Sequence, residues 1–405
     1  AIVNPELDTE FPGRSLAGVG VIFYVIMALR SRLRDLNWFK RQQIQEPNLG
    51  RLLDYVALGT VADVVPLDQV NRVLVHQGLL RIRSGHCHPG LRALIELSGR
   101  HSQSITASDL GFALGPRLNA AGRLDDMALG IECLLTDDEA IAKEIAEQLD
   151  ELNNDRKEIE GQMKNEAMAL LDEMKALDDT HLPAGVCLFD QNWHQGVIGI
   201  LASRIKDRLH RPVIAFAPGE HGEIKGSARS IQGVHIRDVL SDIASSHPTV
   251  LKKFGGHAMA AGMTLKMSDY PVFSMAFDEM VEKRMEKMDI DQKVYTDGEL
   301  SEEDISLHFA DFLQESGPWG QEFPEPAFEG VFDVVQSRIV GRNHLKLVLR
   351  LPFSELLIDA LAFNVEQPEL WLGLRKIKTV YKLDVNDYRG NRSIQFILQY
   401  LEKMQ

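Results

Sequence analysis

Apolar side chains in the first hundred residues recur at the spacing of α-helices. Between residues 21 and 33 they form one face of a helix that ends in basic residues. Residues 52–58 form a second apolar stretch, which leads into a turn at Gly59-Thr60 and then to Asp63, and residues 71–82 predict a further helix. We read residues 1–107 as the closing part of an α/β domain.

The segment 108–179 is predicted to be mainly helical. Acidic and basic residues alternate from residue 137 to residue 175, and Gly161 is the one glycine or proline among them. Leu149, Leu152, Ile159 and Met163 keep a rhythm close to that of a helix. This pattern predicts one long connecting helix with a charged, solvent-exposed face.

Residues 180–290 change to an alternation of strands and helices. A linker at 180–185 is followed by short apolar strands at 186–189 and 213–217, with a helix at 196–209 between them. Further strands are expected at 225–230 and 263–265, and a helix at 270–288. The alternation predicts a small α/β domain.

From residue 291 onward the pattern predicts one helix followed by many short strands. The helix covers residues 302–315, and the strands cover residues 331–335, 344–351, 356–363, 379–385 and 393–400. Short strands separated by Gly and Asn turns indicate a small β-barrel. The whole chain is therefore expected to be an α/β multidomain protein.

Composition and charge narrow the class of protein only partly. The chain has 405 residues, too many for one ordinary core, and a net charge of −15. Residues 136–180 hold 15 acidic residues against 5 basic ones, whereas residues 331–405 hold 11 basic residues against 8 acidic ones. The acidity is thus concentrated in the connecting segment, and the charge permits nucleic-acid binding without arguing for it.

Cysteines and apolar runs indicate a compartment. Cys87, Cys133 and Cys187 are widely spaced and form no metal-binding pattern, which fits free thiols in a reducing environment. The longest apolar run, residues 16–29, falls short of the ~20 residues that span a bilayer. We expect a cytoplasmic protein without a membrane anchor.

The stretch Gly255-Gly256-His257 is the strongest candidate for chemistry. Two glycines allow close backbone approach to a ligand, and the histidine that follows can donate a hydrogen bond to an anionic oxygen. Such a loop suits phosphate. A tight turn before a buried strand is the other interpretation, and spacing alone favours it.

Several other side chains have two interpretations each. Asp63 could bind a hard divalent metal ion or cap a helix, and capping is favoured on the residues alone. Arg123, near an expected helix N-terminus, could grip a phosphate or pair with Asp125 or Asp126. The Gly196-flanked turn at His194 could present amides to phosphate or cap a helix.

Two more candidates complete the predicted phosphate site. Ser227 and Arg229 are two positions apart in a predicted strand, so their side chains share a face and can address one phosphate together. Asn119 is expected to bond to backbone or substrate nearby. In the barrel, basic and aromatic residues suggest a track for single-stranded DNA: Arg342, Lys346, Arg375, Lys378, Tyr381 and Arg389.

Four motifs together resemble the DHH phosphoesterase superfamily, in particular its exonucleases specific for single-stranded DNA. They are residues 58–67, 115–123, 225–230 and 254–262. The resemblance implies the end of a DHH catalytic domain at 1–107, a connecting helical segment at 108–179, a DHH-associated substrate-binding domain at 180–290 and an oligonucleotide-binding (OB)-like barrel at 291–405.

The resemblance also implies a function. It predicts 5′-to-3′ exonuclease activity on single-stranded DNA in repair and recombination, with two Mg²⁺ or Mn²⁺ ions and Asp63 as a metal ligand. It assigns Arg123, Ser227 and Arg229 to the 5′ end of the substrate. Expected partners are single-stranded DNA and a single-strand-binding protein or helicase, and the protein is expected to be a monomer.

One part of the family pattern is missing from this sequence. It contains no Asp-His-His, and no Asp-x-Asp before Asp63. We expect an N-terminally truncated fragment that does not hydrolyse DNA, or a divergent paralogue. Two alternatives stay open: a phosphodiesterase for short oligonucleotides or cyclic dinucleotides, which would not need the barrel, and a non-catalytic DNA-binding scaffold.

Overall fold

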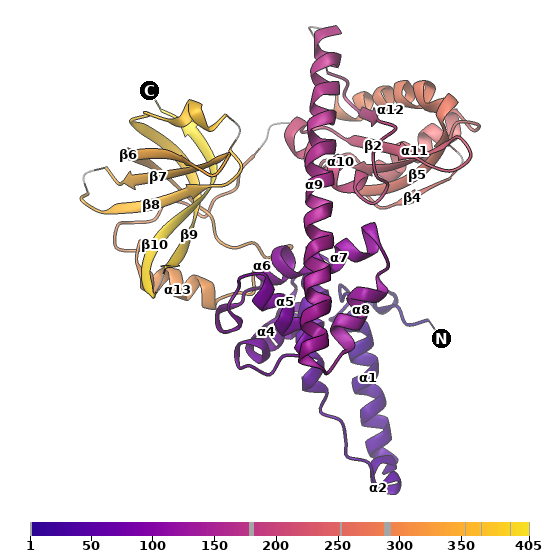
Figure 1. Ribbon diagram of the computed structural model, residues 1–405, viewed down its shortest axis with the longest axis vertical. Coiled ribbons are helices and arrows are strands. Elements are labelled where there is room, and N and C mark those ends of the chain that lie inside the picture. The colour runs from indigo at the N-terminus through magenta and orange to yellow at the C-terminus, as the bar shows by residue number, and fades with distance from the viewer. Residues whose placement is uncertain are drawn as a thin grey trace. The chain divides into compact units, whose positions relative to one another are not determined.

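A computed structural model describes residues 2–177, 182–251, 253–286, 293–352, 354–365, 367–388 and 390–404. The chain divides into two compact units. The first unit comprises Ala1–Gly115 and Lys293–Gln405, and the second comprises Pro116–Gln292. Figure 1 colours the chain from end to end, so that both segments of the first unit can be followed.

The N-terminal segment of the first unit is helical, and residues 2–115, all of them described, include no strand. The helices expected at 21–33 and 71–82 are confirmed, and the apolar stretch 52–58 is helical as well. The segment contains α1 (Gly18–Asp35), α2 (Trp38–Gln42), α3 (Leu53–Ala62), α4 (Gln69–Arg83), α5 (Pro89–Leu97), α6 (Ala107–Asp109) and a π-helix (Leu110–Leu114). None of the described helices has the length and apolar character needed to cross a membrane.

The turn expected at Gly59-Thr60 is wrong, because both residues lie inside α3. The glycine serves helix packing instead. A Cβ at Gly59 would come within 2.7 Å of Val19 Cγ1 on α1, so a bare backbone lets the two helices approach each other.

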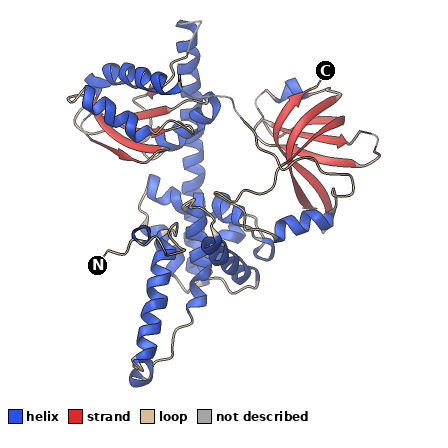
Figure 2. Ribbon diagram, turned by 180° about the vertical axis from the view of Figure 1, so that it is seen from behind, coloured by secondary structure: helices blue, strands red, loops and turns tan. Residues whose placement is uncertain are grey.

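The C-terminal segment of the first unit forms a closed barrel of five strands in the order β10-β8-β7-β6-β9 (Figure 2). All five expected strands are confirmed, while α13 (Leu307–Glu315) begins five residues later than expected. The strands are β6 (Phe328–Val340), β7 (His344–Arg350), β8 (Leu357–Ala362), β9 (Lys376–Tyr388) and β10 (Asn391–Lys403). Alternate residues of β7 and β8 are buried, as expected for strands with one face in a barrel core.

The second unit begins with helices. The expected connecting helix is confirmed as α9 (Glu139–Leu177), 39 residues long, preceded by α7 (Gly115–Leu124) and α8 (Ala128–Leu135). Met163, Ala167 and Leu171 recur at helical spacing on α9 and are buried in a hydrophobic cluster. The acidic residues of α9 are mostly left on its solvated side.

The sheet of the second unit has the strand order β1-β2-β3-β5-β4. The first pair is parallel and the others are antiparallel. The expected strand–helix alternation is confirmed by β1 (Val186–Phe189), α10 (Ile198–Leu209), β2 (Val213–Pro218), β3 (Glu223–Arg229), α11 (Ile236–Ser246), β4 (Lys253–Gly256), β5 (Ala260–Lys266) and α12 (Tyr270–Met285).

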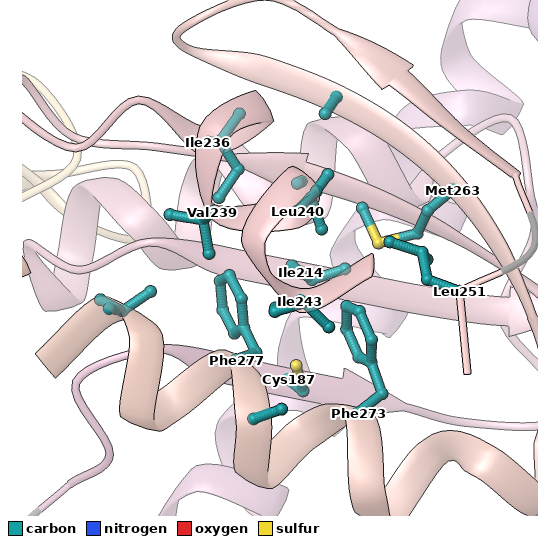
Figure 3. Close-up of a cluster of buried hydrophobic side chains, with 14 of the residues drawn as sticks. Cys187, Ile214, Ile236, Val239, Leu240, Ile243, Leu251, Met263, Phe273 and Phe277 are labelled. Carbon is teal, nitrogen blue, oxygen red and sulfur yellow. The ribbon is translucent and has the colours of Figure 1, made fainter. Parts of the chain in front are cut away.

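Helices cover the two faces of this sheet unequally. On one face, α11 and α12 bury apolar side chains against four strands, as the close-up of Phe273, Phe277, Ile243 and Met263 shows (Figure 3). On the other face, the hydrophobic cluster contributed by α9 and α10 includes residues of β1 and β2 but none of β4 or β5. This second face carries the candidate site.

Candidate functional site

Arg123 is held by the backbone of a distant segment. It lies in the last turn of α7, so its expected position near a helix N-terminus is wrong. Its Nη1 donates a hydrogen bond to the carbonyl oxygen of Gly196 at 3.0 Å. No ion pair joins it to Asp125 or Asp126 among the described residues. A cation suits the negative end of a helix, so this location stabilises Arg123 without a carboxylate partner.

Arg229 and Ser227 occupy the same face of β3, as their spacing predicts. Arg229 Nη1 donates to Ala228 O at 2.9 Å and lies 3.4 Å from Ser227 Oγ. The first turn of α10 approaches both side chains closely. A Cβ at Gly199 would lie 3.0 Å from Ser227 Oγ and 3.1 Å from Arg229 Nη2, so glycine leaves room for them.

The charges at this site are poorly compensated. Burial lowers the pKa of the Arg229 guanidinium, and the positive charge of Arg123 lowers it further. Burial also lowers the pKa of Arg123, with a further contribution from the charge of Arg156, while Glu160 acts in the opposite direction. Burial and neighbouring cations disfavour the charged form of both arginines, so an anion would be stabilised at this site.

Arg156, on α9, is a residue that the sequence interpretation missed. Its Nη1 bonds to Glu160 Oε2 and its Nη2 to Asn153 Oδ1, each at 3.1 Å, while its Nε is buried without a hydrogen-bond partner. Glu160 also bonds to Arg204 of α10 at 3.1 Å. The sequence does show Arg156 four residues before Glu160 in an acid-rich helix. It does not show that Arg156 comes close enough to Arg123 to affect its pKa.

The His194 side chain closes the turn before α10 and does not cap the helix, whose N-cap is Val197 without a side-chain hydrogen bond. His194 Nδ1 accepts the Gly196 amide at 3.1 Å, so that amide is already used within the turn. Trp193 Nε1 donates to Glu166 on α9 at 2.9 Å, which attaches the turn to the long helix. The contribution of Gly196 to the site is its carbonyl group, which accepts from Arg123.

The Gly-Gly-His stretch ends an edge strand. Gly255 and Gly256 close β4, and the chain turns at residues 257–259 before β5. Gly256 has φ +152°, and a Cβ there would come within 2.3 Å of Ala260 O. His257 is exposed, and its amide bonds to Ala260 O at 2.8 Å. Gly255 opposes Gly262, which pairs with Ser227, and His257 bonds to Ala260, which pairs with Arg229, so these two residues share the sheet face of Ser227 and Arg229.

Two further candidates are exposed. Asn119 lies four residues before Arg123 on α7, so the two share a helix face, and its side chain makes no hydrogen bond among the described residues. Asp63 follows the last residue of α3, and the next residue, Val64, has φ +54°. This left-handed conformation is rare for a β-branched residue and marks the position as a strained one.

The described residues do not supply a metal centre. No group of three or more His, Cys, Asp or Glu side chains that could hold an ion occurs among them. Asp63 provides one carboxylate, which is one of the several oxygen ligands that Mg²⁺ or Mn²⁺ requires, so a complete metal site needs further ligands. The chemistry of this site is therefore built from the cationic residues of the second unit.

The expected DNA track on the barrel is mostly paired or buried. Tyr381 is 1% exposed and stacks on Phe396 with ring centroids 3.9 Å apart, so its expected role in stacking on DNA is wrong. Lys346 pairs with Asp359 at 2.7 Å and Lys378 with Glu329 at 3.0 Å. Arg342 and Arg375 are exposed, and Arg389 lies outside the described residues.

One exposed aromatic of the barrel was missed. Phe363 directly follows β8, is 53% exposed and packs edge-on against His344 with ring centroids 5.4 Å apart. Its position at the end of an alternating apolar strand was the available signal.

Family models match two parts of the chain. Residues 182–283 match the DHHA1 domain, and residues 296–400 match the RecJ OB domain. These two domains define a DHH-type phosphoesterase with an appended oligonucleotide-binding barrel. The pairing agrees with the sheet of the second unit and the closed barrel of the first.

Individual relatives identify the family. The chain is 51% identical to the single-stranded-DNA-specific exonuclease RecJ of Dickeya dadantii over 99% of its length and 70% of that relative. It is 52% identical to the RecJ of Escherichia coli, covering 98% of the chain and 69% of the relative. The chain belongs to the RecJ family.

A solved structure supports the same assignment. The structure of RecJ from Thermus thermophilus in complex with Mn²⁺ superimposes with a TM-score of 0.77 at 28% identity. It covers 99% of this chain, and this chain covers 55% of it. The present chain therefore spans little more than half of that solved protein.

Proposed function

We propose that the chain belongs to a 5′-to-3′ exonuclease acting on single-stranded DNA and that its second unit captures the 5′-phosphorylated end of the substrate. The observation that carries this proposal is that Arg123 and Arg229 approach one segment: Arg123 bonds to the carbonyl of Gly196 at 3.0 Å, and a Cβ at Gly199 would lie 3.1 Å from Arg229 Nη2. Both guanidinium groups are partly buried, and the charge of Arg123 adds to the lowering of the pKa of Arg229. A terminal phosphate would supply the negative charge that the site lacks, in hydrogen-bond reach of planar donor groups.

The remaining residues would shape the phosphate site. Ser227 offers a hydroxyl beside Arg229, and the carbonyl of Gly196 fixes the orientation of Arg123. His257 and the exposed backbone of Gly255 border the same sheet face. Asn119 extends the surface along α7. Phosphate contacts of this kind carry no base information, so binding should be independent of sequence.

Hydrolysis would require divalent metal ions in addition. The RecJ structures from Thermus thermophilus are complexes with Mg²⁺ or Mn²⁺, and we propose the same ions here, with Asp63 as one ligand. Such ions activate water and stabilise the leaving oxygen when bound. Because one carboxylate cannot hold two ions, the 405 residues alone should bind DNA without cleaving it. Robust turnover of labelled single strands by this chain with Mn²⁺ would contradict that expectation.

Binding to the 5′ end can be tested by fluorescence anisotropy. The 405-residue chain should bind a 3′-labelled single strand more tightly when the strand carries a 5′ phosphate than when it carries a 5′ hydroxyl. Arg229→Gln should abolish the difference, whereas Arg237→Gln, which removes an exposed arginine of α11, should preserve it. Equal affinity of the wild type for both strands would refute capture of a 5′ phosphate.

The biological setting follows from the family. We propose a role in DNA repair and recombination in the cytoplasm, with the protein acting as a monomer on strands exposed by a helicase or coated by a single-strand-binding protein. Cys87, Cys133 and Cys187 are buried and form no disulfide among the described residues, in keeping with a reducing compartment.

A further inference from the structure

Three cross-strand rows of residues lie side by side on the second face of the sheet, the one that carries Ser227. In an antiparallel sheet, directly opposed residues point to the same face, and the next row on that face is two residues along each strand. The pairing of β3, β5 and β4 defines the rows as Arg229–Ala260–His257, Ser227–Gly262–Gly255 and Lys225–Thr264–Lys253.

The middle of these rows has an open floor. Gly255 and Gly262 oppose each other, and a Cβ built on either would meet no atom within 4 Å. Ala260 and Thr264, their neighbours on β5, have small side chains. A ligand can therefore lie directly on the backbone of β5 and β4. We call these three rows the open strip.

The open strip is cationic on both sides. Lys225 on β3 and Lys253 on β4 are exposed, and neither makes an ion pair or side-chain hydrogen bond among the described residues. The three rows contain no acidic residue, in a chain whose net charge is −15. The next row places Glu223 opposite Lys266, so a carboxylate first appears where the strip ends.

The spacing of the rows connects this charge to the phosphate site. Successive rows on one face are roughly 6.8 Å apart, and Lys225 and Lys253 are separated by two strand spacings, about 9.6 Å between Cα atoms. The Arg229 row lies at one end of the strip and the lysine row at the other. A chain of phosphates that starts at Arg229 thus passes over the glycine floor and reaches both lysines.

We propose that the open strip binds the sugar–phosphate backbone of a single strand just downstream of its 5′ phosphate, with Lys225 and Lys253 as the contacts to internal phosphodiesters. This inference rests on the proposed capture of the 5′ end and adds the path and direction of the strand. The 5′ end lies at the Arg229 row, and the strand runs toward the lysine row.

The test compares a ligand that has only a 5′ phosphate with one that has a backbone. Thymidine 5′-monophosphate and a 5′-phosphorylated oligothymidylate dodecamer are bound to the 405-residue chain and to the double variant Lys225→Gln, Lys253→Gln. The double variant should keep wild-type affinity for the mononucleotide. For the dodecamer, the slope of log K against log salt should fall by about 1.4, since each single-strand phosphate contact contributes about 0.7. As the salt concentration rises from about 50 to 200 mM, the ratio of wild-type to double-variant affinity for the dodecamer should therefore fall roughly sevenfold.

A matched control removes two lysines elsewhere on the second unit. Lys143→Gln with Lys157→Gln takes the same charge from exposed positions of α9 and should leave the slope unchanged. An unchanged slope in the Lys225, Lys253 variant, or an equal change in the control, would overturn the inference alone. If Arg229→Gln leaves mononucleotide binding intact, the proposed 5′-phosphate site itself falls.

Discussion

Replacing Gly196 with alanine should displace the backbone of the turn that holds Arg123 and so disrupt the phosphate site. The added Cβ would lie 2.3 Å from Arg123 O, 3.1 Å from Arg123 C and 3.2 Å from His194 Cε1. Ordinary contact begins at 3.4 Å, so the turn must move away from α7 by about 1 Å. That movement lengthens the hydrogen bond from Arg123 Nη1 to Gly196 O, which is 3.0 Å in the structure.

The magnitude follows from two contributions. Overpacking against a backbone carbonyl costs about 1–3 kcal/mol. Weakening a hydrogen bond from a charged donor adds roughly 1–2 kcal/mol. The second unit of Gly196→Ala should therefore lose about 2–5 kcal/mol of unfolding free energy. It should also lose much of its preference for a 5′ phosphate, because Arg123 is no longer held in place.

Tryptophan fluorescence can isolate this effect. Trp193 is the one tryptophan between residues 116 and 292, the range of the second unit. When the other three tryptophans, Trp38, Trp319 and Trp371, are changed to phenylalanine, fluorescence during urea unfolding reports on the second unit alone. Gly161→Ala is the matched control. No atom lies within 4 Å of a Cβ at Gly161 in α9, so this change should stabilise by about 0.5–1 kcal/mol. Wild-type stability and phosphate preference in Gly196→Ala would refute the reasoning.

Three further predictions concern buried groups. Tyr381→Ala should destabilise the barrel by about 3–5 kcal/mol in urea unfolding, because it empties the space against Phe396. Asp54 is fully buried and accepts hydrogen bonds from the backbone amide of His88 at 2.9 Å and from its ring Nδ1 at 2.8 Å. In thermal unfolding, Asp54→Ala should lower the unfolding free energy by about 3 kcal/mol, because both donors lose their acceptor, and Asp54→Asn should lower it less. Burial raises the pKa of Cys133 to about 11, so the stability due to this thiol is complete below about pH 8.5 and declines as the pH rises toward 11. Cys133→Ala should flatten that decline, and an unaltered pH profile would contradict it.

The local sequence pattern was sufficient to predict most helices and strands, but it was insufficient to predict the contacts between them. The five barrel strands and α9 could be predicted because alternation and helical spacing are properties of neighbouring residues. The burial of Tyr381 could also have been predicted from strand alternation. Lys376, Lys378 and Lys382 lie at alternate positions of β9 and so face solvent, which leaves Tyr381 on the side that faces the core. α7 ends just after Arg123 and carries Gly122 in its last turn, whereas a helix was expected to begin near this position.

The site shows the same division. Ser227 and Arg229 share a face because of strand periodicity, which the sequence contains. The contribution of Arg156 depends on how α9 packs near α7, and the use of the Gly196 amide by His194 depends on a turn geometry. The first depends on long-range packing and the second on the local backbone conformation of one turn, and the spacing of residues alone encodes neither.

The two sides of β3 have a consequence for folding fidelity. Ile224, Gly226 and Ala228 face the apolar layer formed by α11 and α12, while the cations and Ser227 alternate with them on the other side. A slip of one position against β5 would push Lys225 and Arg229 into that layer, which is prohibitive for unpaired charges. The cationic residues proposed to bind DNA thus also fix the pairing register of β3 with β5. Correct folding of the sheet therefore forms the DNA-binding surface at the same time.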